Sequence, residues 1–176
     1  GRARMTAMLA RPWVHGLTAV YCSDEQKALD GAAILAGHLG LTPIVMAALG
    51  EVERSSTGFL PEAEHAVAAR LLFERPDESI RGWETARQAQ ARFMAAIEAI
   101  LAGRGATEQG SRGVQEGDIA IVAHGAVGTL YLCHLKGVPI SLSEAQPGRD
   151  GGHYYCFDAA AKKLRHGWVR IEPEAE

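Results

Sequence analysis

The sequence predicts an α/β fold, a three-layer α/β/α sandwich in which helices cover both faces of a mainly parallel central sheet. Two runs of strand length, residues 17–22 and 118–123, consist largely of apolar and β-branched residues. Each run is followed directly by a segment with helical periodicity, and strands that alternate with helices are typical of such sheets. The centre of the second run, IAIVA, is continuously apolar, as expected of a strand buried on both faces of a parallel sheet.

Helical segments are predicted on either side of these strands. Their apolar residues recur at steps of three and four, which is the spacing of one face of a helix. Ser23 and Gln26 have the spacing of a capping box at the start of one helix, and Ser79 can cap another. The expected helices cover residues 1–10, 23–40, 61–73, 79–103 and 127–135.

The remaining segments are predicted to be extended or loop-like. Residues 41–49 favour an extended segment because Pro43 disfavours a helical conformation for the residue before it. Two further strands are expected at residues 154–158 and 164–171, which could form a hairpin. Residues 104–117 are rich in glycine and polar side chains, and we expect a loop there.

This glycine-rich stretch contains a partial match to a phosphate-binding P-loop. Gly105 and Gly110 have the required spacing, but Ser111 and Arg112 stand where the motif needs Lys and Ser or Thr. The preceding segment is also a predicted helix, whereas a P-loop follows a strand. We therefore reject a P-loop.

Length and composition indicate a globular protein of one domain. The chain has 176 residues, of which 47% are hydrophobic and 22% are charged, enough for a sizeable core. It contains no apolar stretch of membrane-spanning length. Its formal net charge of -3 provides no broad attraction for nucleic acid. Membrane-spanning and nucleic-acid-binding proteins are therefore excluded as classes. The net charge does not exclude a local cationic pocket.

The cysteines and the first residues indicate the setting of the protein. Cys22, Cys133 and Cys156 lie far apart among apolar or aromatic neighbours, as free thiols of a reducing compartment usually do. We expect a cytoplasmic protein without disulfides. The first ten residues, GRARMTAMLA, do not begin with methionine and contain no secretory segment. They have the pattern of the middle of an amphipathic helix, so we expect the chain to be N-terminally incomplete.

Two predicted strand ends carry polar residues that could bind a ligand, since ligands of parallel α/β sheets collect at the carboxyl ends of the strands. His124 follows the second strand, where Gly125 and Gly128 would let the backbone approach a ligand closely. A histidine that merely satisfies a turn is an equal alternative. At the other strand end, Lys27 lies four residues after Ser23, in the first turn of the expected helix, where most lysines are simply solvated.

Two carboxylates, Glu51 and Glu53, lie in a polar loop after an apolar segment. A carboxyl group there could donate a proton if its pKa were raised, although such carboxylates are usually surface charge. The other histidines show no metal-ligand spacing, and the neighbouring pairs Cys133–His134 and His153–Cys156 are weak indications of zinc. We expect neither a metal ion nor a cofactor.

The order of four segments resembles the histidine phosphatase superfamily of phosphoglycerate mutase-like proteins. The segments are VYCSDEQKALDGAAILAGHLGL, LGEVERSSTG, DESIRGWETARQAQARFMAAI and GDIAIVAHGAVGTLYLCHLKG, and they cover most of the chain. The resemblance implies the α/β/α fold of that family. It also implies a reaction in which one histidine attacks phosphorus, a carboxylic acid protonates the leaving oxygen and water then releases phosphate.

The resemblance implies a role for each candidate residue. Ser23 stands in the family's serine pair, Lys27 at a phosphate-binding arginine, Glu51 at the proton donor, and His124 with Gly125 at the second histidine motif. Lys27 keeps the charge of the arginine but loses its bidentate recognition of phosphate.

Three features depart from the family pattern. Glu53 lies so close to Glu51 that the identity of the donor stays open, and Gly31 replaces the usual threonine. The nucleophilic histidine motif of the family ends a strand that would precede the first residues of this chain. The letters Arg-His-Gly recur at residues 165–167, but they lead into a strand instead of ending one, so we do not assign the motif there.

The expected function is that of a phosphomonoester hydrolase that acts on a small phosphorylated metabolite through a phosphohistidine. Catalytic roles fall to His124 and Glu51, and phosphate binding to Ser23, Lys27 and Gly125. The alternative is a non-catalytic protein that binds a phosphorylated ligand at a degenerate site. Expected partners are a small phosphorylated substrate or inorganic phosphate, but neither nucleic acid nor a membrane. A homodimer is possible.

Overall fold

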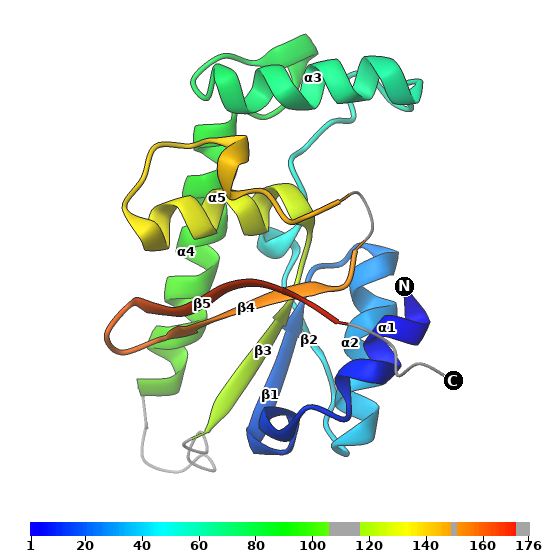
Figure 1. The fold of residues 1–176 in the computed structure, drawn as a ribbon, viewed down its shortest axis with the longest axis vertical. Helices are drawn as coiled ribbons and strands as arrows, with labels where there is room; N and C mark the ends of the chain where they lie inside the picture. Colours follow the sequence, from blue (N-terminus) through cyan, green and yellow to red (C-terminus); the bar gives the residue numbers. More distant parts are fainter. Residues whose placement is uncertain (106–116, 149–150, 172–176) are drawn as a thin grey trace.

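The computed structural model describes residues 1–105, 117–148 and 151–171, and these residues form a three-layer α/β structure (Figure 1). The helices are α1 Arg2–Met8, α2 Gln26–His38, α3 Glu62–Glu74, α4 Ala86–Gly105 and α5 Gly125–Lys136, and the strands are β1 Leu17–Cys22, β2 Ile44–Val45, β3 Asp118–Val122, β4 His153–Asp158 and β5 Lys163–Arg170. Helices α1 and α2 lie on one side of the central sheet, and α4 and α5 lie on the other. The predicted fold class is therefore confirmed.

The central sheet has the order β2-β1-β3 and is parallel throughout. Cys22 at the end of β1 is paired with Val122 at the end of β3, so the two carboxyl ends lie side by side. Strands β4 and β5 form a separate antiparallel pair, which confirms the predicted hairpin. The two strand ends singled out in the sequence therefore share one edge of the sheet.

Among the described residues, β3 pairs on one side only, with β1. Its central residues are half-buried instead of buried, which reflects this edge position. The hairpin packs nearby: Tyr155 and Phe157 join the same apolar cluster as Ile121, whereas Tyr154 joins the cluster on the opposite face of the sheet. Successive side chains of β4 thus pack alternately against the two faces of the central sheet. Among the described residues, however, β4 is not hydrogen-bonded to β3.

Two apolar clusters hold the layers together. One unites α3, α4 and α5 around side chains such as Trp83, Phe93 and Leu130. The other joins α1 and α2 to β1 around Val20 and Leu35. The tryptophan and phenylalanine of the long helical segment are thus core residues. Burying a large apolar side chain stabilises the fold by about 1.5–3 kcal/mol.

Two predicted helix starts are wrong. Helix α2 begins after Glu25 and has no side-chain cap. The Ser23 hydroxyl accepts a hydrogen bond from the backbone N–H of Glu25, one residue before the helix, and contacts His124 Nε2. Ser79 also fails as a cap, since its hydroxyl donates to the carbonyl of Trp83. The capping box of α4 is formed by Thr85 and Gln88, whose backbone amides each donate to the other's side chain.

Other boundaries follow the expected chemistry. Gly40 and Gly137 adopt positive φ angles of 67° and 65° at the ends of α2 and α5, the conformation that glycine tolerates best. The expected extended segment 41–49 contains only the short β2 and a 3-10 turn, Ala47–Leu49. The expected loop and the rejected P-loop of residues 104–117 fall almost entirely outside the described residues.

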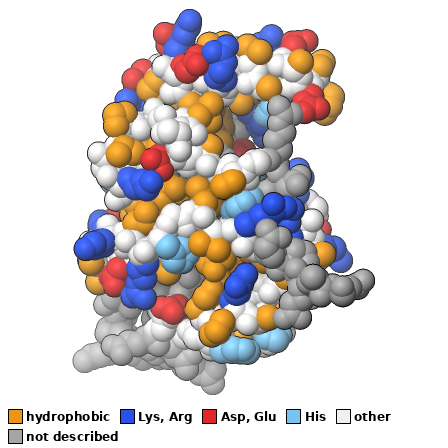
Figure 2. Space-filling view, viewed as in Figure 1, with side chains coloured by type: hydrophobic (Ala, Val, Ile, Leu, Met, Phe, Trp, Pro, Cys, Tyr) orange, Lys and Arg blue, Asp and Glu red, His pale blue; other side chains and the backbone are white. Residues whose placement is uncertain are grey.

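The described helices include none that is both long and apolar enough to cross a membrane. On the face shown in Figure 2, charged side chains gather at the upper end, where α3 carries ion pairs such as Arg70–Glu74. Hydrophobic side chains appear along the middle of the same face.

The cysteines Cys22 and Cys133 are buried free thiols, and burial raises the pKa of both.

Candidate active site

His124 and Ser23 meet at the carboxyl edge of the sheet. The Ser23 hydroxyl lies 2.6 Å from His124 Nε2, and Ser23 is completely buried. The parallel pairing of β1 with β3 brings these residues together, because each comes just after the end of its strand. His124 therefore does more than satisfy a turn.

Glu25 supports this pair. Its carboxylate lies 3.3 Å from His124 Nε2 and accepts a hydrogen bond of 2.7 Å from the backbone N–H of Glu51. A proton on Nε2 would satisfy both oxygen neighbours of the imidazole. No periodicity or motif singled out Glu25 in the sequence, although its position next to a predicted strand end could have drawn attention to it.

Glu51 lies at the N-terminus of α5. Its two carboxylate oxygens accept hydrogen bonds from the backbone N–H groups of Ala126 and Val127 at 3.1 and 3.2 Å. The N-cap residue of this helix, His124, makes no side-chain capping hydrogen bond. The carboxylate of Glu51, which is distant in sequence, caps the helix instead. A helix N-terminus stabilises negative charge, and the same amides could receive a phosphoryl oxygen.

Glu53 lies in a different environment from Glu51. Its carboxylate accepts a 2.7 Å hydrogen bond from the backbone N–H of Ser55 and is open to solvent. This hydrogen bond is the main reason that the pKa of Glu53 is below its usual value. A carboxyl group with a lowered pKa is a poor proton donor near neutral pH, which favours Glu51 over Glu53.

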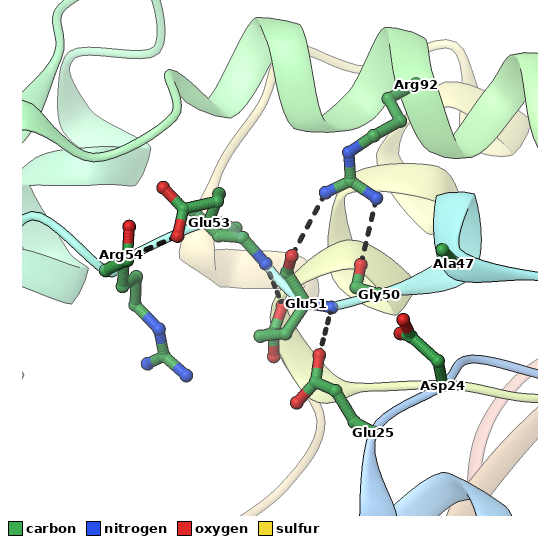
Figure 3. A pocket seen from close by; sticks show the side chains of 10 residues that line it. Asp24, Glu25, Ala47, Gly50, Glu51, Glu53, Arg54 and Arg92 are labelled. Atoms are coloured by element: carbon green, nitrogen blue, oxygen red, sulfur yellow. Dashed lines mark hydrogen bonds between the residues drawn. The ribbon is translucent and has the colours of Figure 1, made fainter. Parts of the chain in front are cut away.

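A cavity of about 470 Å³ opens beside these residues (Figure 3). Its lining contains four carboxylates and two arginines, and the full set is Asp24, Glu25, Ala47, Gly50, Glu51, Val52, Glu53, Arg54, Ser55 and Arg92. Carboxylates outnumber the guanidinium groups. His124 and the first residues of α5 are not among the lining residues, so the imidazole and N–H groups that could bind a phosphate dianion lie beside this cavity and not in its wall.

Arg92 joins the cavity to the long helix α4. Its guanidinium donates to both carboxylate oxygens of Glu84, at 2.9 and 2.8 Å. It also donates to the carbonyl oxygens of Ala48, Gly50 and Glu51. The hydrogen bonds that Arg92 donates to Glu84 raise the pKa of Arg92. These contacts fix the backbone that carries Glu51, and sequence periodicity alone assigned this arginine no role.

The other predicted phosphate ligands are less closely engaged. Lys27 lies in the first turn of α2, as expected, but it is exposed and does not line the cavity. A Cβ atom on Gly125 would lie 3.1 Å from the side-chain nitrogen of Gln146, so this glycine permits close packing beside His124. A Cβ atom on Gly128 would instead lie 3.1 Å from the ring of Trp168, so this glycine permits close packing against Trp168.

The remaining sequence candidates lie elsewhere. The Arg-His-Gly letters of residues 165–167 lie within β5, where His166 is exposed and meets Tyr154 edge-on. Among the described residues, no group of three or more His, Cys, Asp or Glu side chains is arranged to hold a metal ion.

Comparison with solved structures shows the fold. The native mycobacterial glucosyl-3-phosphoglycerate phosphatase matches with a TM-score of 0.67 and 21% identity over 96% of this chain and 86% of that chain. The same enzyme complexed with VO3 gives 0.65 and 22%, over 96% and 82%. Phosphoserine phosphatase from Entamoeba histolytica, in complex with 3-phosphoglyceric acid, gives 0.60 and 15%, over 94% and 79%.

No curated protein matches the chain. The model of one protein family does match, and it spans residues 1–160, nearly the whole sequence. This region includes both strand ends, the Glu51 segment and the long helix α4. The chain belongs to the histidine phosphatase superfamily, branch 1.

Proposed function

We propose that the protein is a phosphomonoester hydrolase that acts on a small phosphorylated metabolite through a phosphohistidine intermediate. The observation that carries the proposal is the convergence of His124, Ser23 and Glu51 beside the N-terminus of α5. Phosphoryl transfer depends mainly on positioning and on N–H groups or cations around the transferred oxygens. The structural relatives named as phosphatases of a glucosyl phosphoglycerate and of phosphoserine support a small metabolite as substrate.

In this proposal the imidazole of His124 and the amides of α5 bind the transferred phosphoryl group. Ser23 and Glu25 orient the imidazole through their contacts with Nε2. Gly125 lets the backbone approach closely, and Lys27 contributes charge from the first turn of α2. The phosphoryl group takes the place of the Glu51 carboxylate at the helix amides.

Glu51 then acts as the proton donor to the leaving oxygen. When the phosphoryl group displaces it from the amides of Ala126 and Val127, its carboxyl group is released to reach the leaving oxygen. Glu53 remains ionised because the N–H of Ser55 lowers its pKa, so the two neighbouring carboxylates take different roles.

The proposal also needs a nucleophilic histidine. Among the described residues, one edge of β3 is unpaired. A parallel strand added there would lie about 4.8 Å away and would end beside His124, which follows β3 by two residues. A histidine at that strand end would put two imidazoles around one phosphorus atom. We propose that a segment preceding Gly1 in the complete protein supplies this strand.

A non-catalytic protein that binds a phosphorylated ligand is the second candidate. One observation favours it: within the described chain, His124 is the one histidine with a contact to Ser23 or Glu25, and its Nε2 is occupied by these partners. Such a protein would keep the phosphate pocket but would lack turnover. The experiment below separates the two candidates.

The test is hydrolysis of an aryl phosphate by the protein expressed from its complete reading frame. We expect turnover, inhibition by vanadate, and a phosphohistidine that can be trapped by an alkaline denaturing quench, because the P–N bond is labile in acid and stable in base. Glu51→Gln lowers kcat by about 10²–10⁴-fold because it removes the general acid. Glu53→Gln is the matched carboxylate control and keeps nearly full activity, and His166→Ala is the matched histidine control.

Absence of turnover together with phosphate binding that is lost in His124→Ala would establish the non-catalytic candidate. Turnover that survives His124→Ala unchanged would refute the proposed site. Equal losses in Glu51→Gln and Glu53→Gln would refute the assignment of the donor.

A further inference from the structure

Glu25 uses only one of its two carboxylate oxygens for contacts within the protein. Its Oε1 atom accepts a 2.7 Å hydrogen bond from the backbone N–H of Glu51 and lies 3.3 Å from His124 Nε2. In the part of the chain that the structure describes, no group donates a hydrogen bond to Oε2. Figure 3 shows this division, because a dashed line joins one carboxylate oxygen of Glu25 to the Glu51 nitrogen and none reaches the other. The Oε2 atom is therefore free to accept a hydrogen bond from a ligand.

The contacts of Oε1 place this carboxylate at the edge of the proposed phosphoryl pocket. Glu25 is the residue before α2, and its backbone N–H donates to Ser23 Oγ at 3.3 Å, so its backbone is fixed beside the pair of Ser23 and His124. The N–H of Glu51 also joins it to the segment whose carboxylate binds the first amides of α5. A phosphoryl group that replaces the Glu51 carboxylate there comes close to Glu25. The Glu25 side chain is 46% exposed and lines the cavity, so it has room to adjust to such a group.

Phosphate and sulfate groups would interact differently with this carboxylate. An ionised carboxylate only accepts hydrogen bonds, and it repels a second anion at close range. A phosphate monoester loses its second proton at about pH 6, so part of it keeps one P–OH group near neutral pH. This hydroxyl can donate to the carboxylate in a short, charge-assisted hydrogen bond. A sulfate ion has the same tetrahedral shape but carries no proton near neutral pH, so the carboxylate only repels it.

We propose that Glu25 accepts a hydrogen bond from a protonated phosphoryl oxygen and thereby makes the pocket select phosphate over sulfate. The inference rests on the function proposed above, since it assumes a phosphoryl group at His124 and the start of α5. Of the carboxylates that line the cavity, Glu25 is the one with a recorded contact to His124 among the described residues. Glu53 instead accepts a hydrogen bond from the N–H of Ser55. Glu25 therefore determines specificity for the transferred group and not for the leaving group.

The test measures binding of inorganic phosphate and of sulfate to the intact protein by calorimetry at one pH near neutrality. We expect phosphate to bind about 10-fold more tightly than sulfate, the lower end of what a hydrogen bond to a charged group contributes, because Glu25 is partly exposed. Glu25→Gln keeps an oxygen for the N–H of Glu51, so we expect it to fold. Its amide donates equally well to either anion, so sulfate binding tightens and the ratio falls to about one. Glu53→Gln is the matched control, which removes the same charge from the cavity and keeps the ratio.

The outcomes separate this inference from the proposed function. If the wild type binds phosphate no more tightly than sulfate, and His124→Ala abolishes binding of both, the inference fails and the phosphate site stands. If Glu25→Gln tightens both anions equally, Glu25 only repels anions and the inference also fails. The same holds if Glu53→Gln lowers the ratio as much as Glu25→Gln, because the ratio then reflects the charge of the cavity. If neither anion binds, both proposals fail.

Discussion

The two sides of the cavity are stabilised in different ways. On the side of α4, Arg92 and Glu84 are mostly buried, with side-chain exposures of 28% and 15%, and they bind each other and the backbone of the Glu51 segment. On the opposite side, Arg54 contacts the imidazole of His65 and stacks on the ring of Trp83. The difference indicates that the first side holds the site in shape and the second is available to a ligand.

The largest expected effect comes from breaking the buried side. Arg92→Gln leaves the Glu84 carboxylate and three carbonyl oxygens with too few donors, and we expect a loss of about 2–3 kcal/mol in the free energy of unfolding. Urea denaturation measures this loss. The control is Arg87→Gln, which removes an exposed pair with Asp77 and should leave the unfolding midpoint nearly unchanged. Equal unfolding midpoints for Arg92→Gln and Arg87→Gln would contradict a structural role of the buried pair.

The pH dependence of the free energy of unfolding should also distinguish the wild type from Arg92→Gln. Burial by itself raises the pKa of Glu84, but hydrogen bonds from Arg92 and from the N–H of Glu53 outweigh it, so the pKa lies below its usual value of 4.5. The wild-type protein therefore loses stability as the pH falls below about 4.5, where the unfolded state takes up the proton first. In Arg92→Gln, burial raises the pKa of Glu84 above its usual value, so we expect this variant to gain stability from Glu84 as the pH falls. The stability difference between the two proteins should narrow as the pH falls, and a constant difference would refute this account.

The sequence predicted the parts of the fold that depend on local pattern. Residues 17–22 form β1 with the expected limits, and glycine ends α2 and α5 as expected. The starts of α2 and α4 were wrong because the hydroxyl of Ser23 is drawn to His124, a contact across 101 residues, and because Thr85 has the capping partner that Ser79 lacks. Tertiary contacts thus overrode local capping signals.

The candidate site shows the same division. Ser23, Glu51 and His124 could be selected because each follows a predicted strand or apolar segment and the resemblance ordered them. Arg54 and Arg92 could not, since their significance lies in which partners neutralise their charge. That information exists only once α3 and α4 are packed against the Glu51 segment.

A smaller effect should follow from removing Glu51, which belongs to the site and to the scaffold at once. Its carboxylate supplies the cap that α5 lacks locally, so Glu51→Ala should lower the free energy of unfolding by about 1 kcal/mol. Millimolar inorganic phosphate should recover part of this loss, because the freed amides can bind it. Thermal denaturation with and without phosphate measures both effects, and Glu53→Ala is the control. If phosphate stabilises Glu51→Ala no more than the wild type, the carboxylate does not compete with phosphate for these amides.

The smallest expected effect on stability is that of Arg54→Gln. Its guanidinium compensates no buried carboxylate among the described residues, and its contacts are to His65 and the Trp83 ring. The glutamine amide can still donate to the imidazole, so we expect a change within about 0.5 kcal/mol in the free energy of unfolding. Urea denaturation beside Arg92→Gln makes the comparison direct. A loss as large as that of Arg92→Gln would mean that both arginines are structural. A near-zero loss leaves ligand binding as the property that distinguishes the open side of the cavity.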